Sequence, residues 1–243
     1  MEPHVVGIIG FGRFGRLWAD VMALRHRVVV TDIVPQPDAR FVSLPDLCAT
    51  SQTIFLCVPI NQFQTAVREL AGHLRPGTTV IDTCSVKVHP AQVLADELGE
   101  RADLTLIATH PMFGPDSAAR GVSGLPMVVW RVAGQEAVYR EWVDFLSELG
   151  IHTVEMAPDD HDRLAAYSQG VTHYVGRVLS KLDLQATPID TQGFKILRSL
   201  VAQTCNDSWE LFHDLQTYNP YTSEMRVRLQ HALNDVYRTL SPD

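Results

Sequence analysis

Two polar residues of this sequence have types and positions that suit proton chemistry. His110 lies in the segment Thr-His-Pro-Met-Phe-Gly-Pro, and Ser85 lies in the segment Asp-Thr-Cys-Ser-Val-Lys, each at the end of a strand-like run. An imidazole accepts protons near neutral pH, so an imidazole and a hydroxyl at neighbouring strand ends suit the oxidation of an alcohol. In that reaction a base takes the hydroxyl proton as hydride leaves the carbon. Considered alone, His110 is better explained as a loop histidine held by a backbone carbonyl.

A glycine-rich segment near the start of the chain could hold the acceptor of such a hydride. Gly10, Gly12 and Gly15 form the pattern G-x-G-x-x-G directly after an apolar strand and at the start of a helix. In that context the first glycine permits a tight turn, the second lets the backbone approach a pyrophosphate, and the third lets the helix pack close to the strand. The alternative is a glycine-rich turn without a ligand. We predict a dinucleotide site that includes the whole loop, namely Gly10, Phe11, Gly12, Arg13, Phe14 and Gly15.

The second and third strands contribute further candidate cofactor residues. Asp32 ends the second strand, where a carboxylate can accept both ribose hydroxyls and would repel a 2′-phosphate. This favours NAD over NADP, although Arg25 and Arg27 lie nearby in sequence and could weaken the preference, and Asp32 could instead be a solvated turn residue. Val58 and Pro59 follow the third strand and are expected at the same edge of the sheet.

The order of the elements predicts an α/β fold for the first two thirds of the chain. Strand-like runs alternate with amphipathic helical stretches, which predicts a Rossmann-like, doubly wound and mostly parallel sheet. The expected strands are residues 4–9, 27–31, 53–58, 78–83, 103–109, 127–132 and 151–156. The expected helices between them are residues 13–24, 61–73, 89–99 and 135–149.

The last third of the sequence has only helical patterns, at residues 158–182, 189–216 and 220–240. We therefore expect a dinucleotide-binding domain at 1–156 and a smaller helical domain at 157–243. So few helices cannot close a core alone, so this region should pack on the first domain or on a second subunit. We expect a homodimer formed through these helices.

Composition and charge exclude several classes of protein. The formal net charge is -8, from 20 Lys+Arg against 28 Asp+Glu, which disfavours nucleic acid and anionic membrane surfaces as partners. No apolar run approaches the roughly 20 residues that span a bilayer. The four cysteines are scattered without a C-x-x-C pair, which disfavours a disulfide framework or zinc site and favours a reducing, cytoplasmic location.

Several segments together resemble the prephenate/arogenate dehydrogenase family of tyrosine biosynthesis. These are Gly-Phe-Gly-Arg-Phe-Gly, Cys-Val-Pro, Asp-Thr-Cys-Ser-Val-Lys and Thr-His-Pro-Met-Phe-Gly-Pro-Asp-Ser, in this order and spacing. Three tail segments, 170–179, 187–194 and 206–212, resemble the plant-type arogenate dehydrogenase branch in particular. The resemblance covers nearly the whole chain, and the histidine segment and the tail segments are more specific than the glycine loop.

The resemblance implies roles for individual residues in an NAD(P)-dependent, typically dimeric enzyme. His110 matches the catalytic histidine that accepts the proton of the ring 4-hydroxyl, and Ser85 matches the serine that positions this histidine and the nicotinamide. Gln169, His173 and Thr191 match positions that contact the substrate. Many bacterial relatives have Ser-His-Leu-Pro-His where this chain has Ser-Gln-Gly-Val-Thr-His, which again favours the plant-type branch.

The choice of substrate depends on one acidic residue of the tail. Arogenate carries an ammonium where prephenate has a side-chain keto group, and a carboxylate would pair with that ammonium and disfavour the keto group. Asp207 occupies the position where the resembling arogenate enzymes carry an acid, so we expect arogenate as the substrate; the alternative is a helix-surface aspartate. The plant enzymes resemble NADP users and lack an aspartate at the position of Asp32, but we follow Asp32 because its repulsion of a phosphate is local.

Other interpretations remain open from the sequence. A prephenate dehydrogenase would use the same scaffold. Another β-hydroxyacid or imine-type dehydrogenase with a Rossmann domain would rely on a tail lysine, for which Lys181 and Lys195 are the only candidates. A non-catalytic NAD-binding regulator is disfavoured, because it would not need both Ser85 and His110. The acidic run 159–162 is expected to be a helix N-terminus and not a metal site, and the reaction needs no metal.

Overall fold

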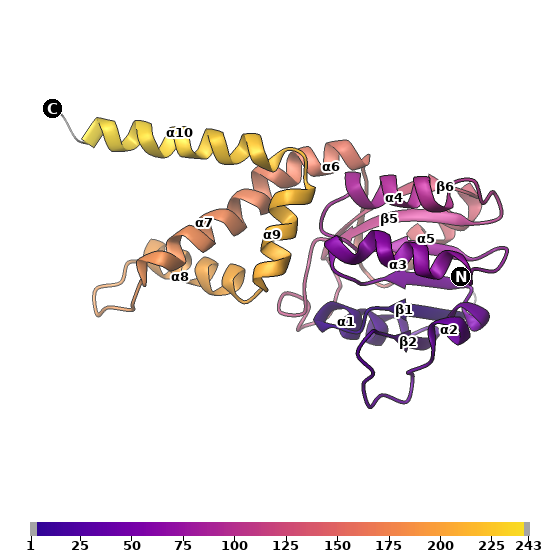
Figure 1. The fold of residues 1–243 in the computed structure, drawn as a ribbon. Coiled ribbons are helices and arrows are strands. Elements are labelled where there is room, and N and C mark those ends of the chain that lie inside the picture. Colours follow the sequence, from indigo (N-terminus) through magenta and orange to yellow (C-terminus); the bar gives the residue numbers. More distant parts are fainter. Residues whose placement is uncertain (1–3, 241–243) are drawn as a thin grey trace. The chain divides into compact units, whose positions relative to one another are not determined.

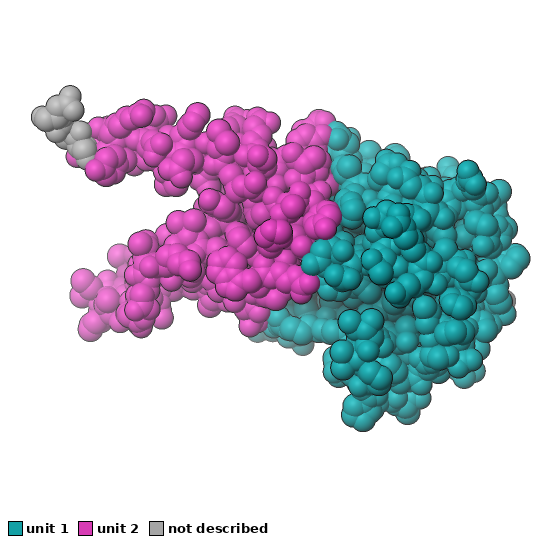
Figure 2. Space-filling model, in the orientation of Figure 1, with its two compact units in different colours: residues 1–161 teal, residues 162–243 magenta. Residues whose placement is uncertain are grey.

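The computed structural model describes residues 4–240, and the chain forms two compact units, residues 1–161 and 162–243 (Figure 2). Their junction lies within helix α6 (Pro158–Ala165), a few residues after the limit of 156 expected from the sequence. Pro158 begins this helix, where its fixed φ and missing N–H are tolerated. No helix within residues 4–240 combines the length and the apolar character needed to cross a membrane.

The first unit is built on a seven-stranded sheet with the order β2-β1-β3-β4-β5-β6-β7 (Figure 1). Strands β1 to β5 are mutually parallel, as predicted from the alternation of strands and helices. They are β1 (Val5–Ile9), β2 (Arg27–Thr31), β3 (Thr53–Leu56), β4 (Thr79–Asp82) and β5 (Thr105–Pro111). The predicted doubly wound, mostly parallel α/β class is therefore confirmed, and the chain reverses direction across the sheet between β1 and β3.

The far end of the sheet runs in the opposite direction. β6 (Pro126–Ala133) pairs antiparallel with β5, and β7 (His152–Glu155) pairs parallel with β6. Two consecutive parallel strands are usually joined by a crossover helix. The connection between β5 and β6, at 112–125, contains no helix, as expected for an antiparallel pair. This loop therefore starts and ends beside the carboxyl end of β5, next to His110.

Helices cover both faces of the sheet. α1 (Arg13–Met22) and α5 (Glu136–Glu148) pack on one face, where Trp18 and Trp142 meet Phe55 edge-on at ring distances of 5.5 and 5.2 Å. Such aromatic pairs each contribute roughly 0.5–1.5 kcal/mol beyond the burial of their area. The other face carries α2 (Leu44–Thr50), α3 (Phe63–Ala71), preceded by the short turn η1 (Ile60–Gln62), and α4 (Val88–Leu98).

Helix α2 was not predicted from the sequence. It is only 7 residues long and contains a proline, so its apolar periodicity is too short to recognise. Its start does carry a local signal, because the Ser43 side chain accepts a hydrogen bond from the Asp46 N–H and Pro45 stands in the first turn.

The second unit is helical, as predicted. Its first helical stretch is continuous through α6, the π-helical turn η2 (Ala166–Gly170), α7 (Val171–Leu179) and the turn η3 (Ser180–Leu182). α8 (Gln192–Cys205), α9 (Trp209–Tyr218) and α10 (Thr222–Leu240) follow. The prediction of one helix over 189–216 is wrong, since α8 and α9 are separate helices.

The break between α8 and α9 has a local cause and a tertiary one. Ser208 caps α9 by accepting a hydrogen bond from the Leu211 N–H at 3.0 Å, which serine does well at a helix start. Arg177 of α7 donates hydrogen bonds to the carbonyls of Asp207 and Ser208, at the turn between the two helices. The turn at 206–208 is therefore held by a side chain from another helix.

Candidate active site

The glycine loop has the backbone that a dinucleotide site needs. Gly10 has φ +93°, and a Cβ there would lie 2.4 Å from the carbonyl oxygen of Cys57, so no other residue fits. A Cβ on Gly15 would lie 1.9 Å from the Gly10 oxygen, whereas a Cβ on Gly12 would meet nothing within 4 Å. The loop is thus tightly packed at two glycines and open at the middle one, as expected where backbone must approach a ligand.

The start of helix α1 also suits an anion. No side chain caps it, and no acidic residue stands in its first turn, so its N–H groups are compatible with a pyrophosphate. The side chains of the loop serve other purposes. Phe11 is buried, Phe14 stacks on Trp18 at a ring distance of 5.8 Å, and Arg13 forms an ion pair with Asp116 at 3.0 Å. These residues fit a bound dinucleotide through their backbone more than through their side chains.

Asp32 lies at the same loop, directly after β2. Its carboxylate accepts hydrogen bonds from the N–H groups of Phe11, at 2.6 Å, and Val34, at 2.9 Å. The carboxylate is therefore fixed beside the glycine loop, as the predicted ribose contact requires.

The basic residues near Asp32 are not those suggested by the sequence. Arg27 begins β2 and Asp32 follows its end, so the two lie about 16 Å apart along the strand at ~3.3 Å per residue. Arg25 and Arg27 therefore lie toward the opposite edge of the sheet from Asp32. The neighbouring cations are instead Arg16 and Arg40, which flank the Phe11 ring at 5.0 and 5.4 Å. Arg40 is bound to Asp38 and Asp20, and its hydrogen bonds lower the pKa of Asp38 to about 2.

Val58 and Pro59 follow β3 at the same sheet edge as the glycine loop. The Cys57 N–H donates to the Ile9 carbonyl at 2.7 Å, which joins this segment to the end of β1. Burial raises the pKa of the Cys57 thiol to about 12, so Cys57 is an unreactive packing residue.

A buried ion pair organises the edge where Ser85 and His110 lie. Lys87 and Asp82 are almost completely buried and bonded to each other, and Lys87 also donates to the Thr109 carbonyl. Asp82 further accepts hydrogen bonds from the N–H groups of Cys84, at 2.8 Å, and Thr109, at 3.0 Å. The loop that carries Ser85 is therefore tied at both ends to the residue preceding His110, and the two predicted side chains follow neighbouring strands, β4 and β5.

His110 has a partner that the sequence interpretation missed. Its Nδ1 lies 2.8 Å from Nε2 of His161, and both side chains are 2% exposed. Burial, together with His161 and Lys87, holds the pKa of His110 well below its usual range. His110 is therefore neutral at physiological pH and can act as a base. No local signal identified His161, because it lies 51 residues away in sequence within a run that we interpreted only as an acidic helix start.

That acidic helix start is present in the structure. Asp159 and Asp160 stand in the first turn of α6, where carboxylates complement the helix dipole. Among the residues that the structure describes, no group of three or more His, Cys, Asp or Glu side chains could hold a metal ion. The four cysteines are free, and two of them are buried.

The second unit has a polar cluster on one face of its first helical stretch. Gln169, His173 and Arg177 are spaced by four residues and therefore share this face. Within residues 4–240, Gln169 Oε1, His173 Nδ1 and Arg177 Nε are buried without a hydrogen-bond partner. Gln169 lies in the π-helical turn, a feature often found at functional sites, whose Gly170 carbonyl accepts a hydrogen bond from Gln216. Buried polar atoms without partners are costly, so this face is suited to binding a polar ligand.

Asp207 joins this polar cluster from the break between α8 and α9. α7 and α8 approach closely at Gly176, where a Cβ would lie 2.0 Å from Thr204 Oγ1. Asp207 Oδ2 thereby lies 3.9 Å from His173 Nδ1, and the Asp207 side chain is 30% exposed. Burial lowers the pKa of His173, and Asp207 partly opposes this effect. The expected acid is therefore placed beside an expected substrate residue.

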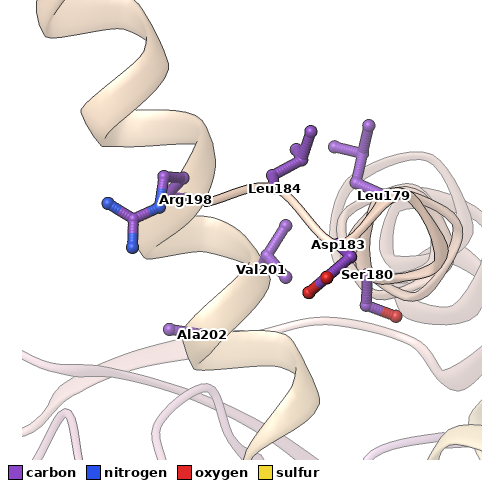
Figure 3. A pocket seen from close by; sticks show the side chains of 7 residues that line it. All are labelled: Leu179, Ser180, Asp183, Leu184, Arg198, Val201 and Ala202. Carbon is purple, nitrogen blue, oxygen red and sulfur yellow. The ribbon is translucent and has the colours of Figure 1, made fainter. Parts of the chain in front are cut away.

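Thr191 and a separate hollow lie elsewhere in the second unit. Thr191 is exposed and caps α8 by accepting a hydrogen bond from the Phe194 N–H at 3.2 Å, so its hydroxyl has a structural role. A hollow of about 250 Å³ lies between η3 and α8 (Figure 3). It is lined by none of the predicted site residues but by Leu179, Ser180, Asp183, Leu184, Arg198, Val201 and Ala202.

Comparisons with known proteins identify the family. Residues 38–125 match the model "Prephenate dehydrogenase, nucleotide-binding domain", and residues 178–243 match "TYRAAT1-like, C-terminal domain". Arogenate dehydrogenase 2, chloroplastic, of Arabidopsis thaliana is 35% identical over 251 residues, which cover 97% of this chain and 69% of that protein. The chain belongs to the prephenate/arogenate dehydrogenase family. The match to the nucleotide-binding model lies within the first unit.

Further members of the family show how far the similarity extends. Arogenate dehydrogenase 1, chloroplastic, of Arabidopsis thaliana is 33% identical, and the match covers 95% of this chain but 38% of that longer protein. Among solved structures, prephenate dehydrogenase of A. aeolicus in complex with hydroxyphenyl propionate and NAD+ has a TM-score of 0.78 at 18% identity, covering 99% of this chain and 91% of that one. Arogenate dehydrogenase of Synechocystis has a TM-score of 0.69 at 20% identity, covering 98% and 94%. These two structures support the fold.

Proposed function

We propose that this protein is an arogenate dehydrogenase that converts L-arogenate to L-tyrosine and CO₂ with reduction of NAD. The observation that carries the reaction type is His110, a buried, neutral histidine at the carboxyl edge of a nucleotide-binding sheet. Family membership supports the same chemistry, and two similar plant proteins are named arogenate dehydrogenases. The alternative is prephenate dehydrogenase activity on the same scaffold.

The residues of the chain divide the proton chemistry and the binding. Bound NAD would supply the hydride acceptor, and the glycine loop and Asp32 would hold it. His110 Nε2, the ring nitrogen that does not face His161, takes the proton of the ring 4-hydroxyl as the hydride leaves C4. Loss of the ring carboxylate as CO₂ then makes the ring aromatic, and His110 returns the proton to the phenolate oxygen. Ser85, on the neighbouring loop, is proposed to position His110 and the nicotinamide.

Substrate recognition is proposed for the polar cluster of the second unit. Gln169 and His173 have buried atoms that a ligand could satisfy, and Asp207 offers a carboxylate to the ammonium of arogenate. Prephenate would place a keto oxygen there, and two acceptors cannot share a hydrogen bond. We retain Thr191 as a proposed substrate contact, although its hydroxyl caps α8.

NAD is the proposed cofactor, with NADP less favoured. The Asp32 carboxylate would bind the ribose hydroxyls and repel a 2′-phosphate. Arg16 and Arg40 are the cations that could attract such a phosphate, but Arg40 already has carboxylate partners in Asp38 and Asp20.

A homodimer through the helical unit is also proposed. Leu233, Val236, Tyr237 and Leu240 are each more than half exposed and share one face of α10 at the spacing i, i+3, i+4 and i+7. Such an apolar stripe is costly in water and is suited to pack against a second copy. We propose functional domains at 1–156 and 157–243. The free cysteines fit a reducing compartment, so we propose the cytoplasm, although two similar plant proteins are named chloroplastic.

Initial rates with arogenate or prephenate, each with NAD or NADP, test the proposal. The absorbance of the reduced nicotinamide measures these rates. The expected result is a clear preference for arogenate with NAD. Preference for prephenate would remove Asp207 from substrate recognition. Binding of NAD without turnover on either substrate would instead support the regulator interpretation.

A further inference from the structure

We propose that His161 is a positioning residue that holds His110 in the tautomer with a free Nε2. This inference rests on the proposed function, because it assigns His161 a part in the proton transfer made by His110. It gives a role to a residue that the sequence offered only as part of an acidic helix start.

The geometry of the two rings defines a specific hydrogen bond. Nδ1 of His110 and Nε2 of His161 are 2.8 Å apart, and the rings meet nearly edge-on, with centroids 5.0 Å apart and planes inclined by 70°. At this separation one nitrogen must donate a hydrogen and the other must accept it. Both rings are almost completely buried, so water cannot readily replace either partner.

Two arrangements of the hydrogens are possible, and only one leaves His110 able to act as a base. If His161 donates, neutral His110 carries its hydrogen on Nε2 and has no lone pair there for a substrate hydroxyl. If His110 donates from Nδ1, its Nε2 is free to accept the proton. The proposed reaction therefore requires His161 Nε2 to be the acceptor.

Besides fixing the tautomer, His161 Nε2 is expected to stabilise the positive charge that His110 carries after proton transfer. Burial is the main factor that disfavours a positive charge on His110, and Lys87, from the loop between β4 and α4, adds to it. Lys87 is itself paired with Asp82 of β4. Once His110 has taken the substrate proton, the His161 lone pair receives the hydrogen bond of the imidazolium and stabilises it.

The first turn of α6 fixes His161 where this role needs it. The His161 N–H donates to the Ala157 carbonyl at 2.9 Å, so its backbone is bound as soon as the helix begins at Pro158. β7, which leads into this turn, pairs with β6, and β6 pairs with β5, the strand that carries His110. The two histidines are therefore joined through consecutive strands of one sheet.

The test compares His161→Leu, which removes the acceptor, with His161→Gln, whose amide oxygen can replace it. His161→Leu should lower kcat about 10²-fold, with little change in KM for either substrate, because a mispositioned base loses its part in acid–base catalysis. His161→Gln should restore most of kcat. The matched control is His152→Gln, an exposed histidine of the same unit, which should leave kcat unchanged.

A second measurement needs no turnover. Long-range ¹H–¹⁵N correlation spectra of the wild-type protein, assigned with the His161→Gln and His110→Asn variants, should show His110 protonated at Nδ1. A hydrogen on Nε2 of His110, or wild-type kcat in His161→Leu, would overturn the role of His161 while leaving the proposed function intact. Absence of turnover by the wild-type protein on both arogenate and prephenate would overturn the proposed function, independently of the tautomer spectrum. If His161→Leu does not fold, His161→Gln and the spectrum still decide the inference.

Discussion

The two polar clusters of this chain differ in how completely their atoms are bonded. At the edge of the first unit, Asp82, Lys87 and Thr109 bond to one another, and His110 faces His161. On the α7 face of the second unit, Gln169, His173 and Arg177 each have a buried atom that lacks a hydrogen-bond partner within residues 4–240.

This difference is the one expected between a prearranged reaction centre and a binding surface. A proton acceptor must already be oriented when the substrate arrives, so its partners belong to the protein itself. A binding surface gains affinity when the ligand satisfies polar atoms that the protein leaves without partners, and the same atoms reject a ligand that cannot bond to them. Substitutions at the first cluster should therefore change turnover or stability, and substitutions at the second should change the choice of substrate.

The largest effect is expected for His110→Asn. It removes the base, so kcat should fall about 10²- to 10⁴-fold with arogenate, while NADH affinity measured by fluorescence titration should stay within about twofold. The control is His73→Asn, an exposed histidine of the same unit. If NADH affinity falls together with kcat, His110 contributes to cofactor binding, and its assignment to proton transfer alone is wrong.

Lys87→Met should lower the free energy of unfolding by about 3–5 kcal/mol, because it leaves the Asp82 carboxylate buried without its cation. Denaturant titration followed by circular dichroism measures this loss. Adding Asp82→Asn should recover part of the stability, and Arg75→Met, at an exposed cation, serves as control. A loss below about 1 kcal/mol would mean that the ion pair does not hold the reaction edge.

Asp207→Asn should lower the ratio of kcat/KM for arogenate to that for prephenate by about 10-fold or more, since a hydrogen bond to a charged group contributes roughly 1.5–3 kcal/mol. Asp183→Asn makes the same change of charge at an exposed position of the same unit and should leave the ratio unchanged. An unchanged ratio in Asp207→Asn would show that the acid beside His173 does not select the substrate.

Asp32→Ser should lower the preference for NAD over NADP about 10-fold, because a repulsion of roughly 1.4 kcal/mol disappears and Arg16 and Arg40 remain nearby. Values of kcat/KM with each cofactor at saturating arogenate give the ratio. Asp144→Ser, on the exposed side of α5, is the control. An equal loss of affinity for both cofactors would mean that Asp32 only stabilises the glycine loop and does not select the cofactor.

The smallest effect on catalysis is expected at His26. Its Nε2 is also buried without a hydrogen-bond partner within residues 4–240, but it lies at the opposite edge of the first unit. Burial and neighbouring positive charge lower its pKa from 6.5 to about 4, so the unfolded chain binds more protons between these values. Stability should therefore be complete above pH 6.5 and decrease as the pH falls toward 4. His26→Phe should flatten this dependence and leave kcat/KM unchanged. A change in kcat/KM would contradict the purely structural role expected for His26.

Much of the fold could be predicted because its signals are local. Apolar runs alternated with amphipathic stretches, and each of the seven predicted strands overlaps a strand of the sheet. The glycine loop could be predicted from the spacing of its glycines, because the close approach of Gly10 to Cys57 and of Gly15 to Gly10 leaves no room for a side chain. Prediction failed for α2, which is too short for periodicity, and at 206–208, where an arginine of another helix holds the break.

The sequence by itself determined the α/β order, the glycine loop, and the positions of Ser85 and His110 at the ends of neighbouring strands. Spacing along one strand or helix encodes these features, because the backbone repeats are fixed. Only the tertiary structure decided that His110 pairs with His161, 51 residues away, and that the Asp207 carboxylate lies beside His173. Contacts of this kind depend on how strands and helices pack, and neither residue type nor spacing specifies that packing.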